Sequence, residues 1–211
     1  MTITNITPTP NNKFRYNIHL NDQFAFTLYK SELRHYNIKI GNDLPPETHQ
    51  EITTKLLPKR AKTRALHLLK NRRYTAKQIR DKLKQGDYTD EIIDETITYL
   101  KSSKYIDDEQ YAKDYITYHI TTRSRNRIYQ DLYKKGIPFE ITAKIYSEET
   151  TNNITTDTEL NTEELERTQI HKWLEKKKYI KENADIKEKQ RLFGFLSRKG
   201  YSTEMINKIL L

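Results

Sequence analysis

The chain lacks several features on which whole classes of protein depend. Its 211 residues include no cysteine and only five glycines, and no apolar run approaches the length of a membrane span. Without cysteine there is no disulfide and no thiolate chemistry, which fits a reducing cytoplasm. Five scattered glycines form neither a phosphate-binding loop nor a dinucleotide fingerprint. Because the first residues also lack a basic-then-apolar signal pattern, we expect a soluble, cytoplasmic protein without a membrane segment.

The polar residues do not indicate a catalytic or metal centre. Six histidines are scattered one per expected element, without the close spacing of a helical metal site. They are His19, His35, His49, His67, His119 and His171. The adjacent carboxylates Asp107 and Asp108 fit the start of a helix better than an acid–base pair. We therefore expect no catalytic residue, no metal, no cofactor and no enzymatic activity.

The composition is basic and unusually polar. Lysine and arginine number 38 against 29 aspartates and glutamates, which gives a formal net charge of +9. Only 35% of the residues are hydrophobic, and the mean hydropathy is −0.95. So few apolar side chains fit either partial disorder or an elongated array of repeats that touch only their neighbours. The positive balance favours a polyanionic partner.

A motif that occurs three times favours the array of repeats. It is centred on Leu83, Leu132 and Leu196, with apolar residues four positions before, five after and nine after each leucine. A glycine precedes the second of these columns each time. The matching residues are Ile79, Ile128 and Leu192, then Tyr88, Ile137 and Tyr201, then Ile92, Ile141 and Met205, with Gly86, Gly136 and Gly200. This pattern predicts a helix, a glycine stop, a short turn and another helix.

The N-terminal part has a different period. Apolar residues alternate with polar ones on both sides of Asn21-Asp22, which predicts a β-hairpin over residues 14–29. The predicted fold is mainly α, an elongated array of three tandem three-helix repeats preceded by this small β-hairpin unit. The expected parts are a flexible N-terminus (1–12), a β-hairpin and short helix extension (13–60), repeat 1 (61–104), repeat 2 (105–146), an acidic linker (147–160) and repeat 3 (161–211).

Capping patterns and charge refine these boundaries. Thr75 with Gln78, Asp107 with Gln110 and Asn161 with Glu164 have the spacing of a capping box at a helix start. Residues 123–127 are expected to connect two helices of repeat 2. Residues 147–160 hold four acidic residues and no basic one, which predicts a solvated linker or extended loop.

Clusters of basic residues are the candidate binding sites. Most of them fall at junctions between expected helices, where they could line one edge of the array. Their guanidinium and ammonium groups suit phosphate or carboxylate oxygens, although any single cluster could be an ordinary solvated face. Trp173 and most of the 15 tyrosines are expected to pack in the core. The candidate residues are Arg72, Arg73, Arg123, Arg125, Arg127, Lys176, Lys177, Lys178, Arg198 and Lys199.

The repeats resemble the RecX regulatory family. The resemblance rests on the three tandem repeats, on residues 105–112 (YIDDEQYA), and on the steps Gly136-Ile137 and Gly200-Tyr201. It covers about residues 61–211, and the hairpin looks like the extension of longer members. The resemblance implies a non-enzymatic regulator that binds the RecA filament on single-stranded DNA. We expect a monomer, with at most weak direct binding to DNA. Such a regulator inhibits recombinase, ATPase and co-protease activities, and so modulates homologous recombination, DNA repair and the SOS response.

Two other functions fit the residues alone. A stand-alone protein that binds single-stranded or duplex DNA would use the same basic edge, since each helix-turn-helix could place a helix in a groove. A structural adaptor would instead hold a helix of another protein in an apolar groove. Whether the basic edge meets protein or DNA is left open by the sequence.

Overall fold

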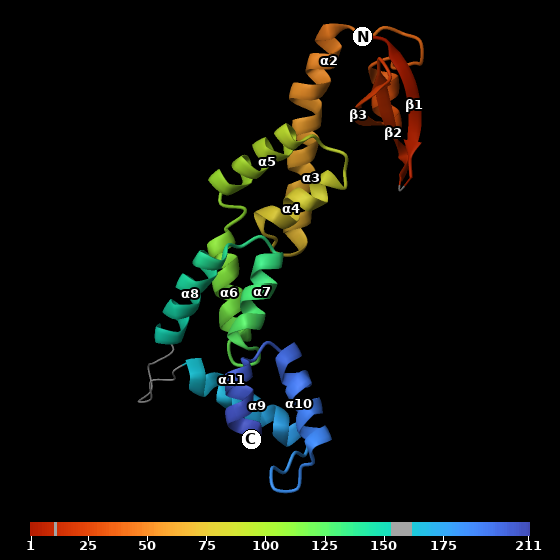
Figure 1. Cartoon of the computed structure of the whole chain (residues 1–211). Helices are drawn as coiled ribbons and strands as arrows, with labels where there is room; N and C mark the ends of the chain where they lie inside the picture. Colours follow the sequence, from red (N-terminus) through yellow and green to blue (C-terminus); the bar gives the residue numbers. More distant parts are fainter. Residues whose placement is uncertain (11, 153–161) are drawn as a thin grey trace. The chain divides into compact units, whose positions relative to one another are not determined.

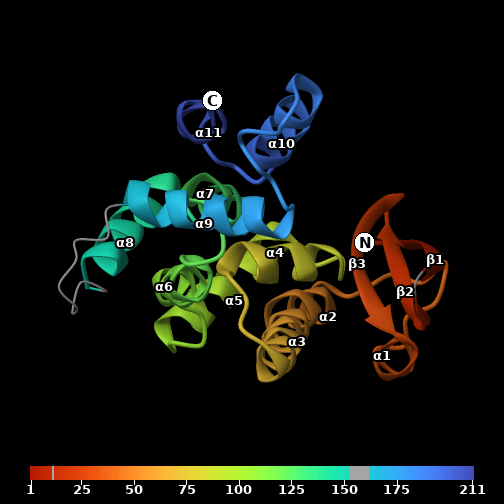
Figure 2. The ribbon, with the colours of Figure 1, turned by 90° about the horizontal axis from the view of Figure 1, so that it is seen from below.

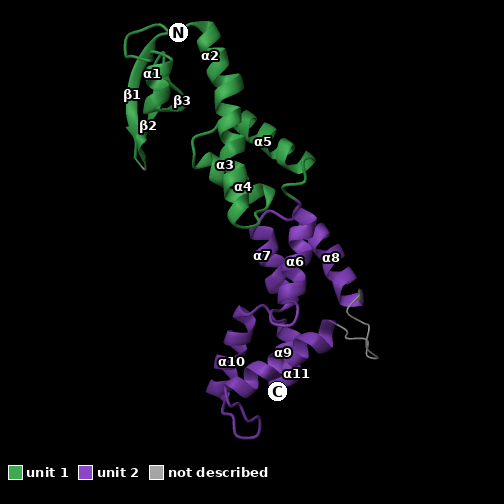
Figure 3. Cartoon of the chain, turned by 180° about the vertical axis from the view of Figure 1, so that it is seen from behind, with its two compact units in different colours: residues 1–106 green, residues 107–211 purple. Residues whose placement is uncertain are grey.

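The structure is a computed structural model that describes residues 1–10, 12–152 and 162–211. The chain divides into two compact units, Met1–Ile106 and Asp107–Leu211 (Figure 3). Both are mainly helical, and the first also contains a small sheet, as the sequence predicts (Figure 1).

Unit 1 begins with a three-stranded antiparallel sheet in the order β1-β2-β3. The predicted hairpin corresponds to β2 (Asn12–Leu20) and β3 (Gln23–Tyr29). Its turn residues Asn21 and Asp22 both have positive φ, 49° and 65°, as a type I′ turn requires. The expectation of a flexible start at residues 1–12 was wrong, because β1 (Ile3–Thr9) pairs with β2. Its anchor is Ile3, which is 1% exposed.

The helices of unit 1 include one that packs on the sheet and the helices of the first repeat. They are α1 (Lys30–His35), α2 (Pro46–Glu51), a π-helical turn η1 (Ile52–Leu56), α3 (Leu57–Asn71), α4 (Ala76–Lys84) and α5 (Asp90–Ser102). Helix α1 packs against β2 and β3 (Figure 2). The boundary expected at residue 61 falls inside α3, which continues the helix begun at Pro46. Thr75 and Gln78 form the predicted capping box of α4.

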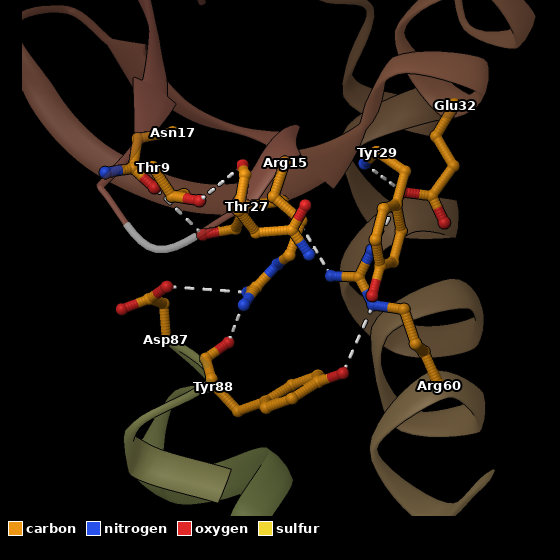
Figure 4. Close-up of polar contacts among 11 residues, drawn as sticks. Thr9, Arg15, Asn17, Thr27, Tyr29, Glu32, Arg60, Asp87 and Tyr88 are labelled. Carbon is orange, nitrogen blue, oxygen red and sulfur yellow. Dashed lines mark hydrogen bonds and ion pairs between the residues drawn. The ribbon is translucent and has the colours of Figure 1, made fainter. Parts of the chain in front are cut away.

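Two arginines join the sheet to the first repeat (Figure 4). The Arg15 side chain is 9% exposed and contacts the α4–α5 turn through Asp87, with a nitrogen–oxygen distance of 3.4 Å. It also donates to the carbonyl of Gly86 at 2.6 Å. Arg60 of α3 donates to the Thr27 carbonyl at 2.6 Å and pairs with Glu32 at 2.8 Å. These contacts link β2, β3 and α1 to α3 and to the α4–α5 turn.

Unit 2 contains two further three-helix groups. Their helices are α6 (Asp108–His119), α7 (Arg125–Lys134), α8 (Phe139–Asn152), α9 (Thr162–Lys176), α10 (Ile186–Arg198) and α11 (Thr203–Leu210). Each group buries its own apolar cluster, one centred on Leu132 and the other on Leu196. This matches the local cores that repeat proteins build.

The boundaries within unit 2 differ from the predicted ones at two places. The expected connector 123–127 is wrong, because α7 begins at Arg125 with Ser124 as its N-cap. The Ser124 hydroxyl accepts from the Arg127 N–H at 3.2 Å. Residues 147–152 of the expected acidic linker are the last turns of α8, because the side chains of Tyr146 and Glu149 are buried and hold the helix in place. The remainder of that linker, and the Asn161 cap, lie outside the described residues.

The repeated motif ends its helix in the same way in all three copies. The three central leucines are each 0% exposed. The backbone N–H five positions later donates to the carbonyl of that leucine, at 3.5, 3.1 and 3.3 Å. Gly136 and Gly200 have φ of 87° and 93°, as predicted, but in the first copy Asp87 takes the left-handed position, with φ of 59°. The turn therefore needs one left-handed residue, and its place shifts by one in the first copy.

Candidate functional site

The predicted basic residues fall in both units. In unit 1, Arg72 and Arg73 follow the end of α3 and are exposed, and the Arg72 guanidinium lies 4.3 Å from the centre of the Tyr74 ring. In unit 2, four of the predicted residues line one cleft of about 850 Å³. These four are Arg123, Arg127, Arg198 and Lys199. The structure thus brings residues 75 positions apart into one candidate site.

We call this feature the cationic cleft; it lies between the second and third repeats. Tyr118 and His119 come from the end of α6, Trp173 from α9 and Phe195 from α10. No acidic side chain is among the residues that line it. Within the described residues, neither Arg198 nor Lys199 has an ion pair with an acidic group. The cleft therefore presents four cations, of which Arg198 and Lys199 have no acidic partner within the described residues, and this suits an anionic ligand.

One carboxylate beneath the cleft holds two of the arginines. Asp131 of α7 has a side chain that is 12% exposed. One of its oxygens lies 2.7 Å from an Nη of Arg123 and 3.2 Å from Nε of Arg127. The same oxygen accepts from the Tyr115 hydroxyl at 3.1 Å. Because each guanidinium carries five donors, both arginines keep donors for a ligand while their positions are restrained.

Aromatic rings hold the lysines on the other wall. The Lys199 ammonium lies 4.5 Å from the centre of the Trp173 ring and 5.5 Å from that of Phe195. Lys176 and Lys177 approach the same two rings at 5.1 and 5.0 Å. Trp173 and Phe195 meet edge to face, with centroids 5.5 Å apart. Such cation–π contacts restrain flexible ammonium groups near the cleft.

The remaining predicted cations do not line the cleft. Lys178 takes the left-handed position after α9, with φ of 55°. Arg125 lines a separate pocket with Glu163 and Lys208. The predicted basic residues of unit 2 therefore lie in several places, and they do not form one row along a single edge.

Burial and neighbouring charge shift the titration of groups around the cleft. Burial and the Arg123 charge lower the pKa of His119, so this imidazole is neutral at pH 7. Burial and the Asp131 charge raise the pKa of Tyr115 to about 12, which keeps its hydroxyl protonated as a donor. The positive charge of the cleft at neutral pH therefore comes from arginine and lysine alone.

Close contacts fix the two repeats that form the cleft. The Ser124 hydroxyl donates to the Lys199 carbonyl at 2.8 Å. Gly200 has no room for a side chain, since an added Cβ would lie 2.6 Å from Ser124 Oγ. On α9, Glu166 accepts from the Arg125 N–H at 2.7 Å, and Gln169 donates to the Ile120 carbonyl at 2.8 Å. Both walls are thus anchored to each other by buried polar contacts.

Several of these residues were not predicted from the sequence. Trp173 was expected in the core, but it is half-buried and forms part of the cleft wall. Asp131, Glu166 and Ser124 carried no motif of their own. The one available signal was Gly200, whose recurrence predicted a turn but not the close approach to Ser124.

Neither a metal centre nor a membrane helix emerges from the described part of the chain. Its residues contain no group of three potential metal ligands. None of its helices combines the length and the apolar character needed to span a membrane.

Comparison with known families links the chain to one group of proteins. The model for the N-terminal domain of regulatory protein RecX matches residues 1–44. Models for the first and third three-helix domains of RecX match residues 61–100 and 164–210. Together these three matches cover more than half of the sequence.

Curated relatives and solved structures agree with these matches. Regulatory protein RecX of Clostridioides difficile is 28% identical over 212 residues, covering 99% of this chain and 93% of the relative. The RecX protein of Caldanaerobacter subterraneus is 29% identical over 197 residues, covering 93% and 92%. A crystal structure of regulatory protein RecX superposes with a TM-score of 0.59 at 24% identity, over 99% and 98% of the two chains. RecX from Lactobacillus salivarius gives 0.54 at 24% identity, over 73% and 94%.

Proposed function

This chain belongs to the RecX family of regulatory proteins, and from that premise we propose that it regulates the RecA recombinase. It binds the RecA filament on single-stranded DNA and inhibits recombinase, ATPase and co-protease activities. Through this inhibition it modulates homologous recombination, DNA repair and the SOS response in the cytoplasm. Its curated relatives are named regulatory proteins, which agrees with binding rather than catalysis.

The observation that carries this proposal is the cationic cleft. Among the described residues, four cations line it and no acidic side chain does, and Asp131 beneath it pairs only with Arg123 and Arg127. A nucleoprotein filament offers both acidic protein surface and DNA phosphate. A binding protein needs such a surface but no reaction centre. Repeats with separate cores also suit a partner built of repeating subunits.

The proposal is tested by the rate of ATP hydrolysis by RecA on single-stranded DNA. We expect the wild-type chain to lower this rate in proportion to its concentration. The triple variant Arg123→Gln, Arg125→Gln, Arg127→Gln should need roughly 10–100 times more protein for the same inhibition, if each contact contributes about 0.5–1 kcal/mol. Its inhibition should also respond less to added salt, because fewer charged contacts remain to be screened.

Two controls separate binding from folding. Lys144→Gln removes a positive charge from the surface of α8, where the Lys144 side chain is 73% exposed, and it should inhibit like the wild type. Arg123→Lys with Arg127→Lys keeps the charge but removes the guanidinium fork. Unchanged inhibition by the folded triple variant at low salt would contradict a role for these arginines. No effect of the wild-type chain on RecA would contradict the proposed function itself.

A further inference from the structure

We propose that the cationic cleft binds single-stranded nucleic acid, with phosphates on its arginines and lysine and a base stacked on Tyr118. The inference rests on the proposed function and specifies which part of the filament this cleft meets. It joins three observations: the cations of the cleft, the restraint on those cations, and one exposed aromatic ring at its rim.

The cations occupy both walls of the cleft. Arg123 and Arg127 belong to the second repeat, and Arg198 and Lys199 to the third. A strand passing between these walls would meet a positive group on either side. The cleft volume of about 850 Å³ lies within the usual range for sites that enclose a small organic ligand, so a nucleotide can enter.

These cations are held in place before a ligand arrives. Asp131 restrains both arginines, with nitrogen–oxygen distances of 2.7 and 3.2 Å. Trp173 restrains Lys199 at 4.5 Å. A restrained cation loses less conformational entropy on binding than one on a mobile side chain. Asp131 and Trp173 are therefore positioning residues for the proposed phosphate contacts.

The exposed ring favours nucleic acid over an acidic peptide. Tyr118 lines the cleft although 77% of its surface is exposed. It meets His119 edge to face at 84°, so that contact does not stack a second ring on the tyrosine. A base can stack on such a face, and stacking on an aromatic side chain tolerates any sequence. An acidic peptide would use the cations but would have no comparable use for the ring.

The cleft contains its own optical probe. Trp173 is the only tryptophan in the chain, and it forms part of the wall beside Lys199. Its fluorescence therefore reports a ligand in the cleft directly, without RecA. The probe used is an oligothymidylate of about 12 nucleotides, within the range of site sizes that basic aromatic grooves occupy.

We expect the oligothymidylate to quench Trp173, and its affinity to fall steeply with salt. Arg123→Gln with Arg127→Gln should weaken binding about tenfold and lower the slope of log affinity against log salt by about 1.4, at roughly 0.7 per phosphate contact on a single strand. Tyr118→Ala should weaken binding roughly 5- to 100-fold. The same tyrosine variant should bind a chain of abasic sugar phosphates as the wild type does.

Control variants and ligands keep the test decisive. Tyr118 is exposed, so its loss does not threaten folding. Lys144→Gln serves as the control for loss of a positive charge outside the cleft. No quenching at low salt, unchanged binding by Tyr118→Ala, or equal quenching by polyglutamate would overturn the proposal. The RecA ATPase assay distinguishes failure of this inference from failure of the proposed function. Loss of oligonucleotide binding with intact inhibition of RecA removes this inference only, whereas an inert chain in that assay removes the proposed function.

Discussion

Replacing Gly200 with alanine tests whether the contact between the second and third repeats is as close as described. Gly200 has φ of +93°, and an added Cβ would lie 2.6 Å from Ser124 Oγ and 3.1 Å from the Arg127 nitrogen. The left-handed backbone costs an alanine about 1–2 kcal/mol, and overpacking at such a contact costs about 1–3 kcal/mol. We therefore expect Gly200→Ala to destabilise unit 2 by about 2–5 kcal/mol.

The same substitution at Gly194 provides a control of opposite sign. Gly194 lies inside α10, and an added Cβ would lie 3.5 Å from the Arg198 guanidinium, which is an ordinary contact. Alanine in a helix interior is about 0.5–1 kcal/mol more favourable than glycine. Gly194→Ala should therefore stabilise the unit in which Gly200→Ala is destabilising.

Urea unfolding followed by Trp173 fluorescence measures both variants in the same unit. The free energy of unfolding falls by about 1–3 kcal/mol per molar urea. The urea midpoint of Gly200→Ala should therefore fall by about 1–2 M, and that of Gly194→Ala should rise by a few tenths of a molar. If the two alanine variants had the same stability, the steric argument would be wrong.

Two further predictions concern buried charge in the two units. Burial raises the pKa of the Glu166 carboxyl group. The folded chain therefore keeps the carboxyl proton to a higher pH than the unfolded chain does. The stability that the protonated Glu166 contributes is lost as the pH rises through the raised pKa. Glu166→Gln keeps an acceptor for the Arg125 N–H without the charge, so in urea titrations it should be at least as stable as wild type at pH 7. That advantage should disappear below about pH 4.3, the ordinary glutamate pKa; a disadvantage that grows with pH would refute this. In unit 1, Arg60→Met should destabilise by about 2–3 kcal/mol in thermal unfolding followed by circular dichroism, because it leaves the largely buried Glu32 without its 2.8 Å partner. Lys62→Gln removes a more exposed ion pair with Glu95 and should lower the free energy of unfolding by less than about 1 kcal/mol. Equal losses of stability in the two variants would contradict the larger contribution of the buried Arg60–Glu32 pair.

The repeat motif was predictable because burial imposes a strict spacing on each helix pair. Leu83, Leu132 and Leu196 had to face a core, and each is fully buried. The N-caps at Thr75 and Asp107 were predictable for a similar reason, since a cap acts over three residues. Of the two, only Thr75 forms the full capping box, because the Gln110 side chain donates to Asp114 instead. Asp107 accepts from the Gln110 N–H at 2.9 Å, as expected.

The cleft was not predictable, because it depends on contacts between distant segments. Ser124 and Lys199 are separated by 75 positions, and no local pattern relates them. β1 was missed for the same reason: only its pairing with β2 makes a strand of a polar segment that contains Pro8. Trp173 was assigned to the core because an aromatic residue on a helical stripe packs inward more often than it lines a cleft.

Co-sedimentation with preformed RecA filaments on single-stranded DNA tests the central claim most directly. We expect the wild-type chain to pellet with the filament, and to pellet less as salt is raised. The triple variant at Arg123, Arg125 and Arg127 should remain largely in the supernatant at the same concentration, while Lys144→Gln should pellet like the wild type. If the wild-type chain stayed in the supernatant with filaments as it does alone, regulation of RecA through this cationic surface would be contradicted.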